Sequence, residues 1–449
     1  MEEKNICKKI YAMIVPIITE SFLVMMADFV SMGMIGRIDV FAVGAQGLSN
    51  RIIGIVWCLF NGISTGVTIL VSYAYGSENP KKIKKVAQQS LISIVGLIII
   101  AQQLMYWNAS TLLNFFKPKP EMLANSLMYM RIILIGLPFQ GVMMVVTGIL
   151  QGMGDATTPM KITIIVNLVN IICGYALIFG HFGLKALGLK GAAISLVTAQ
   201  FVGALIGLWV LFNKNGVLGH MKIKKLFKID TKQITAIFKL GLPSSFESIF
   251  WQLAAIVLSR VMLSFGEGPM ESYPLGLQAE NISDMLGIGF GTVATTFIGQ
   301  TYGAKDKKLG KAYFKEIIKG SLLFTAIGTA ILVIFPRPIM RLLTNNKEVI
   351  KLGSVYIFLM GLIQIPQGVQ RVFNGALKGA GYTRIPMIIA AIGLWGIRVP
   401  VSLILTYYFK LDIISIWVVI CIDQVCRFIL SYILFKKKDI FAESEELAA

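Results

Sequence analysis

Long apolar runs recur along the whole chain and constrain its fold more than any other feature of the sequence. A helix needs roughly 20 apolar residues to cross a bilayer, and twelve segments near that length are separated by short polar clusters. These segments are residues 11–36, 50–75, 88–107, 123–150, 162–182, 191–212, 236–265, 277–302, 316–335, 350–376, 385–408 and 413–435. Because backbone polar groups in lipid must be hydrogen-bonded internally, we predict an all-α, polytopic membrane protein with twelve transmembrane helices.

The chain is strongly basic although only 14% of its residues are charged: 42 Lys and Arg face 23 Asp and Glu, a formal charge of +19. The lysines lie between apolar runs rather than among aromatics on a soluble face, which argues against a nucleic-acid partner. Connections on the side of the N-terminus hold 24 Lys and Arg, and the opposite connections hold 9. This bias predicts a multi-pass protein of the plasma (cell inner) membrane with both termini in the cytoplasm.

The chain matches itself at an offset of 227 residues. Gln140–Pro159 aligns without gaps on Gln367–Pro386, with nine identities in 20 positions. The matched positions include Gly152, Gly154 and Pro159 with Gly379, Gly381 and Pro386. Outside this segment, Pro16 and Glu20 match Pro243 and Glu247 at the same offset. Six helices per repeat is an even number, so the two halves enter the membrane in the same sense as parallel repeats.

The repeat predicts two six-helix lobes. We expect an N-lobe over residues 1–212, a basic cytoplasmic loop over 213–235, a C-lobe over 236–435 and a cytoplasmic tail over 436–449. Two such lobes around a central cleft suit alternating access, which makes secondary transport the expected function. The sequence contains no GxxxxGK[ST] loop, so we expect no ATP hydrolysis and no cofactor.

Several motifs resemble one transporter family. They are Pro16 and Asp28 in the first helix, the loop YGSENPKKIKKV with its repeat partner YGAKDKKLGKAY, the paired LQGMGDATTP and LKGAGYTRIP, and LKGAAIS at the start of the sixth helix. Together they resemble the multidrug and toxic compound extrusion (MATE) transporters over nearly the whole chain. The resemblance implies an antiporter, not an enzyme, that expels small organic, mostly cationic, compounds in exchange for protons or sodium.

Asp28 is the leading candidate for ion coupling. It lies 17 residues into the first apolar segment, roughly 26 Å along a helix and so in the outer half of the membrane. Its repeat position is Ala255, so the carboxylate belongs to the N-lobe alone. An ionisable group inside a membrane helix indicates function, and proton uptake or cation binding is expected here. A structural carboxylate paired with Arg51 is the alternative.

In the family, the first-helix Asp works beside polar residues of the fifth and sixth helices. By that resemblance Asn170 matches the fifth-helix Asn, and Asn167 lies one turn before it. The family's second Asp falls on Gly174 and its Thr on Leu196. Because sodium prefers several oxygen ligands, these departures favour H+ as the coupling ion, with Na+ as the alternative.

Acidic residues nearer the cytoplasmic side are candidates for the substrate cleft. Glu247 follows a helix proline, as its repeat partner Glu20 does, and two roles are open for it: an acid that binds cationic substrate, or a structural anchor. Many family members carry a seventh-helix Glu one turn deeper, where this chain has Trp251 and then Gln252. Gln252 and Gln278 complete the cleft candidates, and we expect Glu20 to be structural.

The second half holds further charges within its apolar segments. Glu280 and Asp284 share one face of the eighth segment, and Arg260 of the seventh reaches a similar depth, which predicts an ion-pair cluster. A second cluster is predicted from Arg398, Asp423 and Arg427, where Asp423 and Arg427 have the i, i+4 spacing of a helical pair. If Asp284 or Asp423 were unpaired, it would be a coupling site in the C-lobe.

Other functions remain open at this stage. A lipid-linked oligosaccharide flippase of the same superfamily would have more cationic residues in its cleft. A membrane-embedded acyltransferase is disfavoured, because His181 and His220 fall at or in loops and no catalytic or metal-ligand cluster is evident. The expected partners are therefore the lipid bilayer and small organic cations, and we expect a monomer.

Overall fold

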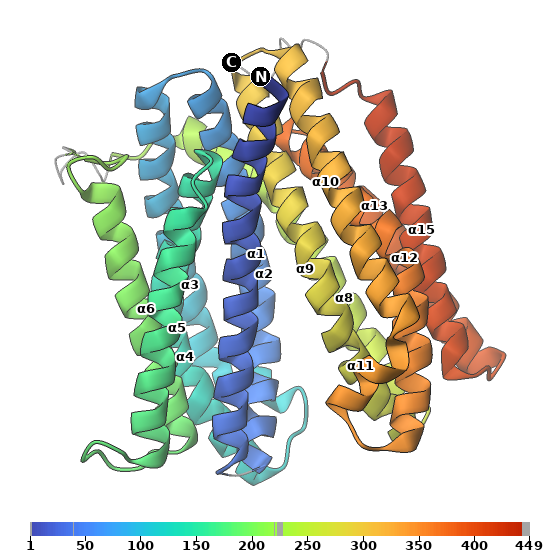
Figure 1. Ribbon diagram of the computed structural model, residues 1–449. Coiled ribbons are helices and arrows are strands. Elements are labelled where there is room, and N and C mark those ends of the chain that lie inside the picture. Colours follow the sequence, from blue (N-terminus) through green and yellow to red (C-terminus); the bar gives the residue numbers. More distant parts are fainter. Residues whose placement is uncertain (1, 39, 220, 222–227, 442–449) are drawn as a thin grey trace. The chain divides into compact units, whose positions relative to one another are not determined.

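The computed structural model describes residues 2–38, 40–219, 221 and 228–441 (Figure 1). Within these ranges every regular element is a helix, and twelve helices are long and apolar enough to cross a membrane. The all-α prediction with twelve membrane spans is confirmed. The helices of the first half are α1 (Glu2–Gly36), α2 (Val40–Gly76), α3 (Pro80–Asn114), α4 (Pro120–Gly152), α5 (Thr157–Phe179) and α6 (Leu189–Phe212).

The second half is less regular than the apolar pattern predicts. Its elements are α8 (Thr231–Leu263), α9 (Glu267–Gly303), α10 (Lys307–Ile334), α11 (Pro336–Leu343), α12 (Lys347–Gly379), α13 (Arg384–Ala391), η1 (Ile392–Arg398), α14 (Val399–Leu403), η2 (Ile404–Tyr408) and α15 (Ile413–Lys437). The short α11 was not predicted. The eleventh membrane span alternates between α-helix and the π-helical turns η1 and η2, and such turns are frequent at functional sites.

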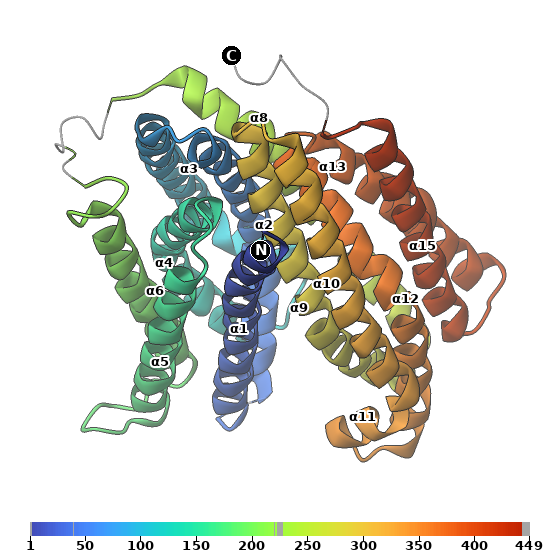
Figure 2. The same cartoon turned by 45° about the horizontal axis from the view of Figure 1, so that its top comes forward.

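Contacts divide the chain into two compact units, which are described one at a time. The N-unit is Val15–Ser245, and the C-unit comprises Met1–Ile14 and Phe246–Ala449, within its described residues. In the N-unit α4 packs against α2, α3 and α6, and α6 packs against α5. In the C-unit α12 is central and packs against α9, α10 and α15, as Figures 1 and 2 show.

The unit boundaries differ from the predicted lobes at the start of each repeat. The beginning of α1 packs in the C-unit, where the Cys7 thiol donates to Glu316 at 3.4 Å. The beginning of α8 packs in the N-unit, where the Ser245 hydroxyl donates to the carbonyl of Leu59 at 2.5 Å. Each crossing lies within three residues of a helix proline, Pro16 or Pro243. The first helix of each repeat therefore belongs partly to the other unit.

The internal repeat is visible in backbone geometry. Gly154 and Gly381 both have φ of +88°, a conformation that a residue with a side chain rarely adopts. A Cβ on Gly152 would lie 2.8 Å from the carbonyl oxygen of Thr68, and one on Gly379 would lie 2.6 Å from that of Thr295. The same 227-residue offset relates both pairs. Small residues at these positions let the helices of each unit approach closely.

The connection between the halves contacts α3 of the N-unit. The Gln89 amide donates to the carbonyl of Lys228 at 2.6 Å and accepts from the Asp230 backbone N–H at 2.9 Å. The Lys85 ammonium forms an ion pair with Asp230, and the hydrogen bond from Lys85 lowers the pKa of that half-buried carboxyl. Residues 228 and 230, near the end of the predicted loop over 213–235, are thus bonded to α3. His220 and residues 222–227 lie outside the described residues.

Candidate functional site

The Asp28 carboxylate lies on α1 within the N-unit and has no ion-pair partner among the described residues. Asp28 interacts electrostatically with the buried Tyr129 of α4, whose hydroxyl is hydrogen-bonded to the side chain of Gln46. Arg51, the alternative partner considered above, forms no ion pair with Asp28 in the described part of the chain and is exposed. The alternative in which Arg51 neutralises Asp28 therefore finds no support in the structure.

A chain of neutral hydrogen bonds lies beside Asp28. The Asn170 amide donates to the Ser31 hydroxyl at 3.3 Å, and the Ser195 hydroxyl donates to the Asn170 oxygen at 3.2 Å. Ser31 is three residues after Asp28, so both occupy the same face of α1. A Cβ on Gly174 would lie 3.5 Å from the Ser195 hydroxyl. Gly174, the position at which the family resemblance implies an Asp, therefore faces this chain of hydrogen bonds but supplies no side-chain oxygen.

Two other polar residues tie α1 to α5. The Thr163 hydroxyl donates to Glu20 at 3.0 Å, and the Asn167 amide donates to the carbonyl of Leu23 at 3.0 Å. Asn167 thus bonds to backbone rather than to the side chain of Asp28. The bond from Thr163 fits the structural role expected of Glu20. The bond from Asn167 to the α1 backbone indicates that Asn167 positions α1 against α5.

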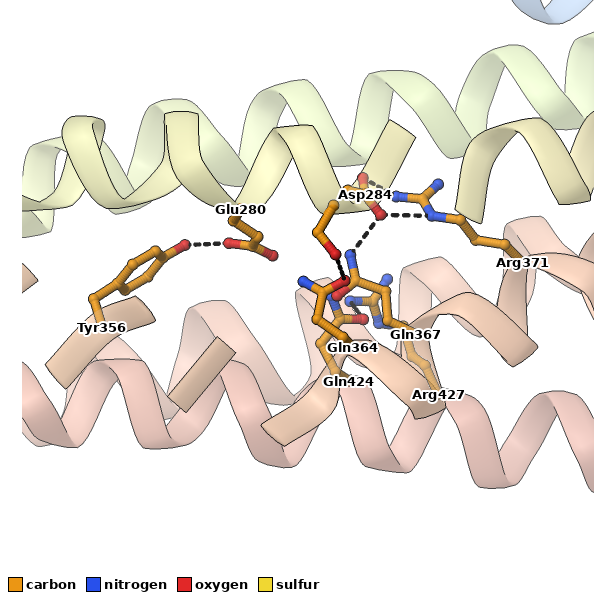
Figure 3. A network of polar contacts seen from close by, with 9 residues as sticks. Glu280, Asp284, Tyr356, Gln364, Gln367, Arg371, Gln424 and Arg427 are labelled. Atoms are coloured by element: carbon orange, nitrogen blue, oxygen red, sulfur yellow. Dashed lines mark hydrogen bonds and ion pairs between the residues drawn. The ribbon is translucent and has the colours of Figure 1, made fainter. Parts of the chain in front are cut away.

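The C-unit holds a denser network of charges, drawn in Figure 3. Asp284 of α9 accepts from the Arg371 Nε at 2.8 Å and from the Gln367 amide at 2.9 Å, and a second Arg371 nitrogen completes a two-bond ion pair. Arg260 was predicted as the cation of this cluster. It is exposed and forms no ion pair within the described ranges, because Arg371 of the packed helix α12 takes that place.

Asp423 of α15 is fully buried between two arginines. It accepts from the Arg398 Nε at 2.8 Å, and from two Arg427 nitrogens at 3.0 and 2.9 Å. Both guanidinium groups also lie over the ring of Trp251, at 5.0 and 4.4 Å from its centroid. The pair expected from the i, i+4 spacing is present. The Trp251 face adds cation–π attraction to both guanidinium groups.

The π-helical turn η1 allows this cluster to form. Arg398 is the last residue of η1, and Gly393 lies in the same turn. A Cβ on Gly393 would lie 2.3 Å from the Asp423 oxygen and 2.4 Å from the Arg427 Cδ. The glycine therefore makes room for the carboxylate and one arginine side chain, and η1 brings Arg398 to their other side.

Glu280 of α9 has a different environment from the other carboxylates. It is 8% exposed, and the Tyr356 hydroxyl donates to it at 2.5 Å. Neither this oxygen nor the other forms an ion pair in the described part of the chain. Figure 3 shows Glu280 pointing toward Tyr356, while Asp284, one turn along α9, points toward Arg371. The predicted Glu280–Asp284 cluster is therefore split into an ion pair and a carboxyl–phenol pair.

The acid considered for the substrate cleft has a cation beside it. The Lys378 ammonium of α12 lies 2.8 Å from the Glu247 carboxylate of α8. Gln252 and Gln278 are half-buried and form no hydrogen bond within the described residues. The ion pair fits the anchor role for Glu247 better than that of a free acid waiting for a cationic substrate.

Three partners were missed in the sequence: Arg371, Lys378 and Tyr356. Arg371 stands inside an apolar segment, which is itself a signal of burial with an acid. Lys378 was counted as a loop residue, but it lies in the last turn of α12. Tyr356 carries no charge and gave no signal in the hydropathy pattern. Depth along a helix was predictable, but the direction in which each side chain points was not.

The fold and these sites define a multi-pass membrane protein built from two repeats. In the described residues of the first repeat Asp28 has no ion-pair partner, and the second repeat holds an ionic network. The family model of MatE matches residues 16–176 and 243–404, two ranges whose starts are 227 residues apart. The chain belongs to the MatE family, a family of transporters and not of enzymes.

Relatives and solved structures agree with this assignment. The chain is 28% identical over 438 residues to the probable multidrug resistance protein NorM of Thermotoga maritima, covering 97% of this chain and 93% of that protein. It is 25% identical over 422 residues to the uncharacterized transporter YisQ of Bacillus subtilis, covering 93% and 91%.

Among solved structures, a MOP superfamily transporter from Pyrococcus furiosus matches with a TM-score of 0.89 and 18% identity, over 96% of both chains. The MATE transporter VcmN of Vibrio cholerae matches with a TM-score of 0.89 and 17% identity, over 98% of this chain and 99% of that one. These likenesses establish the MATE transporter fold over nearly the whole chain.

Proposed function

We propose that this MatE transporter is a multidrug efflux antiporter that exports small organic cations in exchange for protons by alternating access. The relative from Thermotoga maritima is named a probable multidrug resistance protein and aligns over 97% of the chain, which supports export of small organic compounds. The basic bias of the connections supports the inner membrane and cytoplasmic termini as its setting. We further propose that it works as a monomer.

The observation that carries the coupling assignment is the environment of Asp28. This carboxylate is inside a membrane-spanning helix, has no cationic partner among the described residues, and lies one turn from Ser31 in a chain of neutral hydrogen bonds. The side chain is exposed in the N-unit, and an ionised carboxylate within a membrane-spanning helix is costly without a cation. Protonation removes that cost. Asp28 can therefore exchange a proton without breaking an ion pair first.

Sodium coupling is the second candidate, and the geometry supports it less. A sodium ion prefers several oxygen ligands. Beside Asp28 the available oxygens of Ser31, Asn170 and Ser195 are bonded to one another, and Gly174 supplies none. A lipid-linked oligosaccharide flippase is the third candidate. The unpaired acid of the N-unit favours export of cations over transport of an anionic lipid-linked sugar.

Transport by the full chain in proteoliposomes tests this proposal. Wild-type protein is expected to exchange a fluorescent organic cation for protons under an imposed pH gradient, and not under a sodium gradient alone. Asp28→Asn should reduce exchange to the level of empty liposomes, because the amide cannot take up a proton. Glu20→Gln is the matched control, since Glu20 lies two turns earlier on α1 and already has a hydrogen-bond partner in Thr163.

The controls separate loss of coupling from loss of fold. Both variants should keep the thermal unfolding temperature of the wild type within a few degrees. Full proton exchange by Asp28→Asn would refute the coupling role of this residue. Exchange driven by sodium at constant pH would instead identify the second candidate.

A further inference from the structure

Glu280 differs from the other acidic residues of the C-unit network in its counter-charge. Asp284 is paired with Arg371, and Asp423 is shared by Arg398 and Arg427. Glu280 is just as deeply placed but has a phenol as its partner, the Tyr356 hydroxyl at 2.5 Å. A buried carboxyl with a neutral donor and no cation in direct contact can change its charge without breaking a salt bridge.

The groups around Glu280 come from four elements. Its electrostatic neighbours are Tyr273 and Asp284 of α9, Tyr356 and Arg371 of α12, Arg398 of η1 and Cys421 of α15. Asp284 disfavours a second negative charge one turn away, whereas the two arginines favour it. Both arginines are already bonded to other carboxylates. The two arginines near Glu280 are therefore the direct partners of Asp284 and Asp423, and neither is bonded to Glu280.

An aromatic wall excludes further solvation of this carboxyl. The Tyr356 ring packs edge-on against Trp417 and Tyr273, with centroid distances of 5.4 Å in both cases. Tyr356 and Trp417 are 1% and 0% exposed. An ionised carboxylate here has little water to stabilise it, whereas a protonated carboxyl can still accept the Tyr356 hydrogen bond.

The repeat supplies an independent argument. Tyr356 stands 227 residues after Tyr129, so the two tyrosines occupy equivalent positions in α12 and α4. Tyr129 is the electrostatic neighbour of Asp28 in the N-unit, and Tyr356 is the hydrogen-bond donor to Glu280 in the C-unit. The carboxylates come from different helices, α1 and α9, yet Asp28 and Glu280 each lie beside one tyrosine of this equivalent pair. Neither acid has an ion-pair partner among the described residues.

We propose that Glu280 is a second proton-binding site of this transporter, located in the C-unit and governed by Tyr356 and the neighbouring arginine cluster. The proposal rests on the proton-coupled function proposed above and adds a site that Asp28 does not explain. Proton uptake converts the Glu280 carboxylate to a carboxylic acid, and no other bond is formed or broken. The reverse step returns the proton to the aqueous phase.

Protonation of Glu280 changes the charge of the whole network. With Glu280 ionised, it and Asp284 and Asp423 match three arginines, Arg371, Arg398 and Arg427. With Glu280 protonated, one guanidinium loses its share of counter-charge. Arg398 is affected most by this change in charge, since its Nη2 has no hydrogen-bond partner among the described residues. Arg398 is the last residue of the π-helical turn η1. Protonation of Glu280 therefore changes the electrostatic environment of a segment that departs from regular α-helix.

Infrared difference spectroscopy of the purified full chain in lipid nanodiscs tests the site directly. A pH titration of the wild type should show a protonated-carboxyl band that disappears on raising the pH. Glu280→Gln should abolish one component of that band, and Asp28→Asn should abolish another and leave the Glu280 component in place. Glu348→Gln is the matched control, because Glu348 is an exposed carboxylate in the first turn of α12.

A second variant keeps the carboxyl and alters only its donor. Tyr356→Phe should move the Glu280 component to a higher pH, because the ionised form loses its hydrogen bond. It also keeps the test decisive if Glu280→Gln does not fold. An unchanged carboxyl band in Glu280→Gln, or an unchanged titration in Tyr356→Phe, overturns the proposal.

Transport stoichiometry provides the functional readout. In proteoliposomes Glu280→Gln should move fewer protons per organic cation than the wild type, with exchange still driven by the pH gradient through Asp28. An unchanged ratio overturns the second site while the proton antiport stands. If Asp28→Asn instead keeps full exchange, the proposed coupling residue fails, and the infrared titration still decides on Glu280.

Discussion

Replacement of Asp423 by Asn removes one charge from the centre of the arginine cluster and leaves its volume unchanged. Asp423 is 0% exposed, and its partners Arg398 and Arg427 are 6% and 2% exposed. Removing one partner of a buried ion pair costs about 3–5 kcal/mol, because the remaining charge is left without compensation. Here two guanidinium groups depend on one carboxylate, so we expect a loss of about 4–5 kcal/mol in the free energy of unfolding.

Unfolding in mixed detergent micelles, followed by circular dichroism, measures this loss. Asp412→Asn is the matched control: Asp412 is the residue directly before α15, and its exposed side chain makes no capping hydrogen bond, so a change within about 0.5 kcal/mol is expected. The double variant Asp423→Asn/Arg427→Gln should recover about 2 kcal/mol relative to the sum of the single effects, because one unpaired cation is removed. A loss below about 1 kcal/mol for Asp423→Asn, or strict additivity in the double variant, would refute the reasoning.

Two further predictions concern a close approach and an ion pair. Gly393→Ala should cost about 1–3 kcal/mol in the same unfolding assay, because its Cβ would lie 2.3 Å from Asp423; Gly396→Ala, with its nearest neighbour at 4.0 Å, should be tolerated, and equal losses would contradict the packing argument. Lys85 lowers the pKa of Asp230, so their contact is fully present above the ordinary carboxyl pKa and is lost as the pH falls through the lowered value. The protection factor of the Asp230 amide, which is the intrinsic exchange rate divided by the observed rate at each pH, should fall in that acidic range and should show no such step in Asp230→Asn; pH-independent protection in the wild type would rule this out.

The architecture could be predicted from the sequence because its signals are local. Twelve spans follow from the lengths of apolar runs, and the repeat follows from identities such as Gly152 with Gly379. The structure adds the reason for those glycines, since a Cβ at either position would collide with a carbonyl of a neighbouring helix. Both repeats require a small residue at this position, so the two glycines appear as an identity when the sequence is aligned with itself.

The partners of the charged residues could not be predicted in the same way. Arg260 and Arg371 both reach the depth of Asp284, and hydropathy does not say which arginine faces it. The choice depends on the rotation of α12 against α9, which brings together residues 87 apart in the chain. For the same reason the sequence could not show that Cys7, at the start of α1, contacts Glu316, 309 residues later.

The two halves share a scaffold but differ in the chemistry at corresponding helix contacts. In the N-unit the contact between α5 and α6 carries Asn170 and Ser195, joined by one neutral hydrogen bond. In the C-unit the corresponding contact between η1 and α15 carries Arg398 and Asp423, joined by a buried salt bridge. A neutral hydrogen bond of about 1 kcal/mol can rearrange when a nearby carboxylate takes up a proton, whereas breaking a buried salt bridge costs several times more. Protonation is therefore expected to rearrange the α5–α6 contact beside Asp28, while in the C-unit the Arg398–Asp423 bond holds and any response to a proton must begin at Glu280.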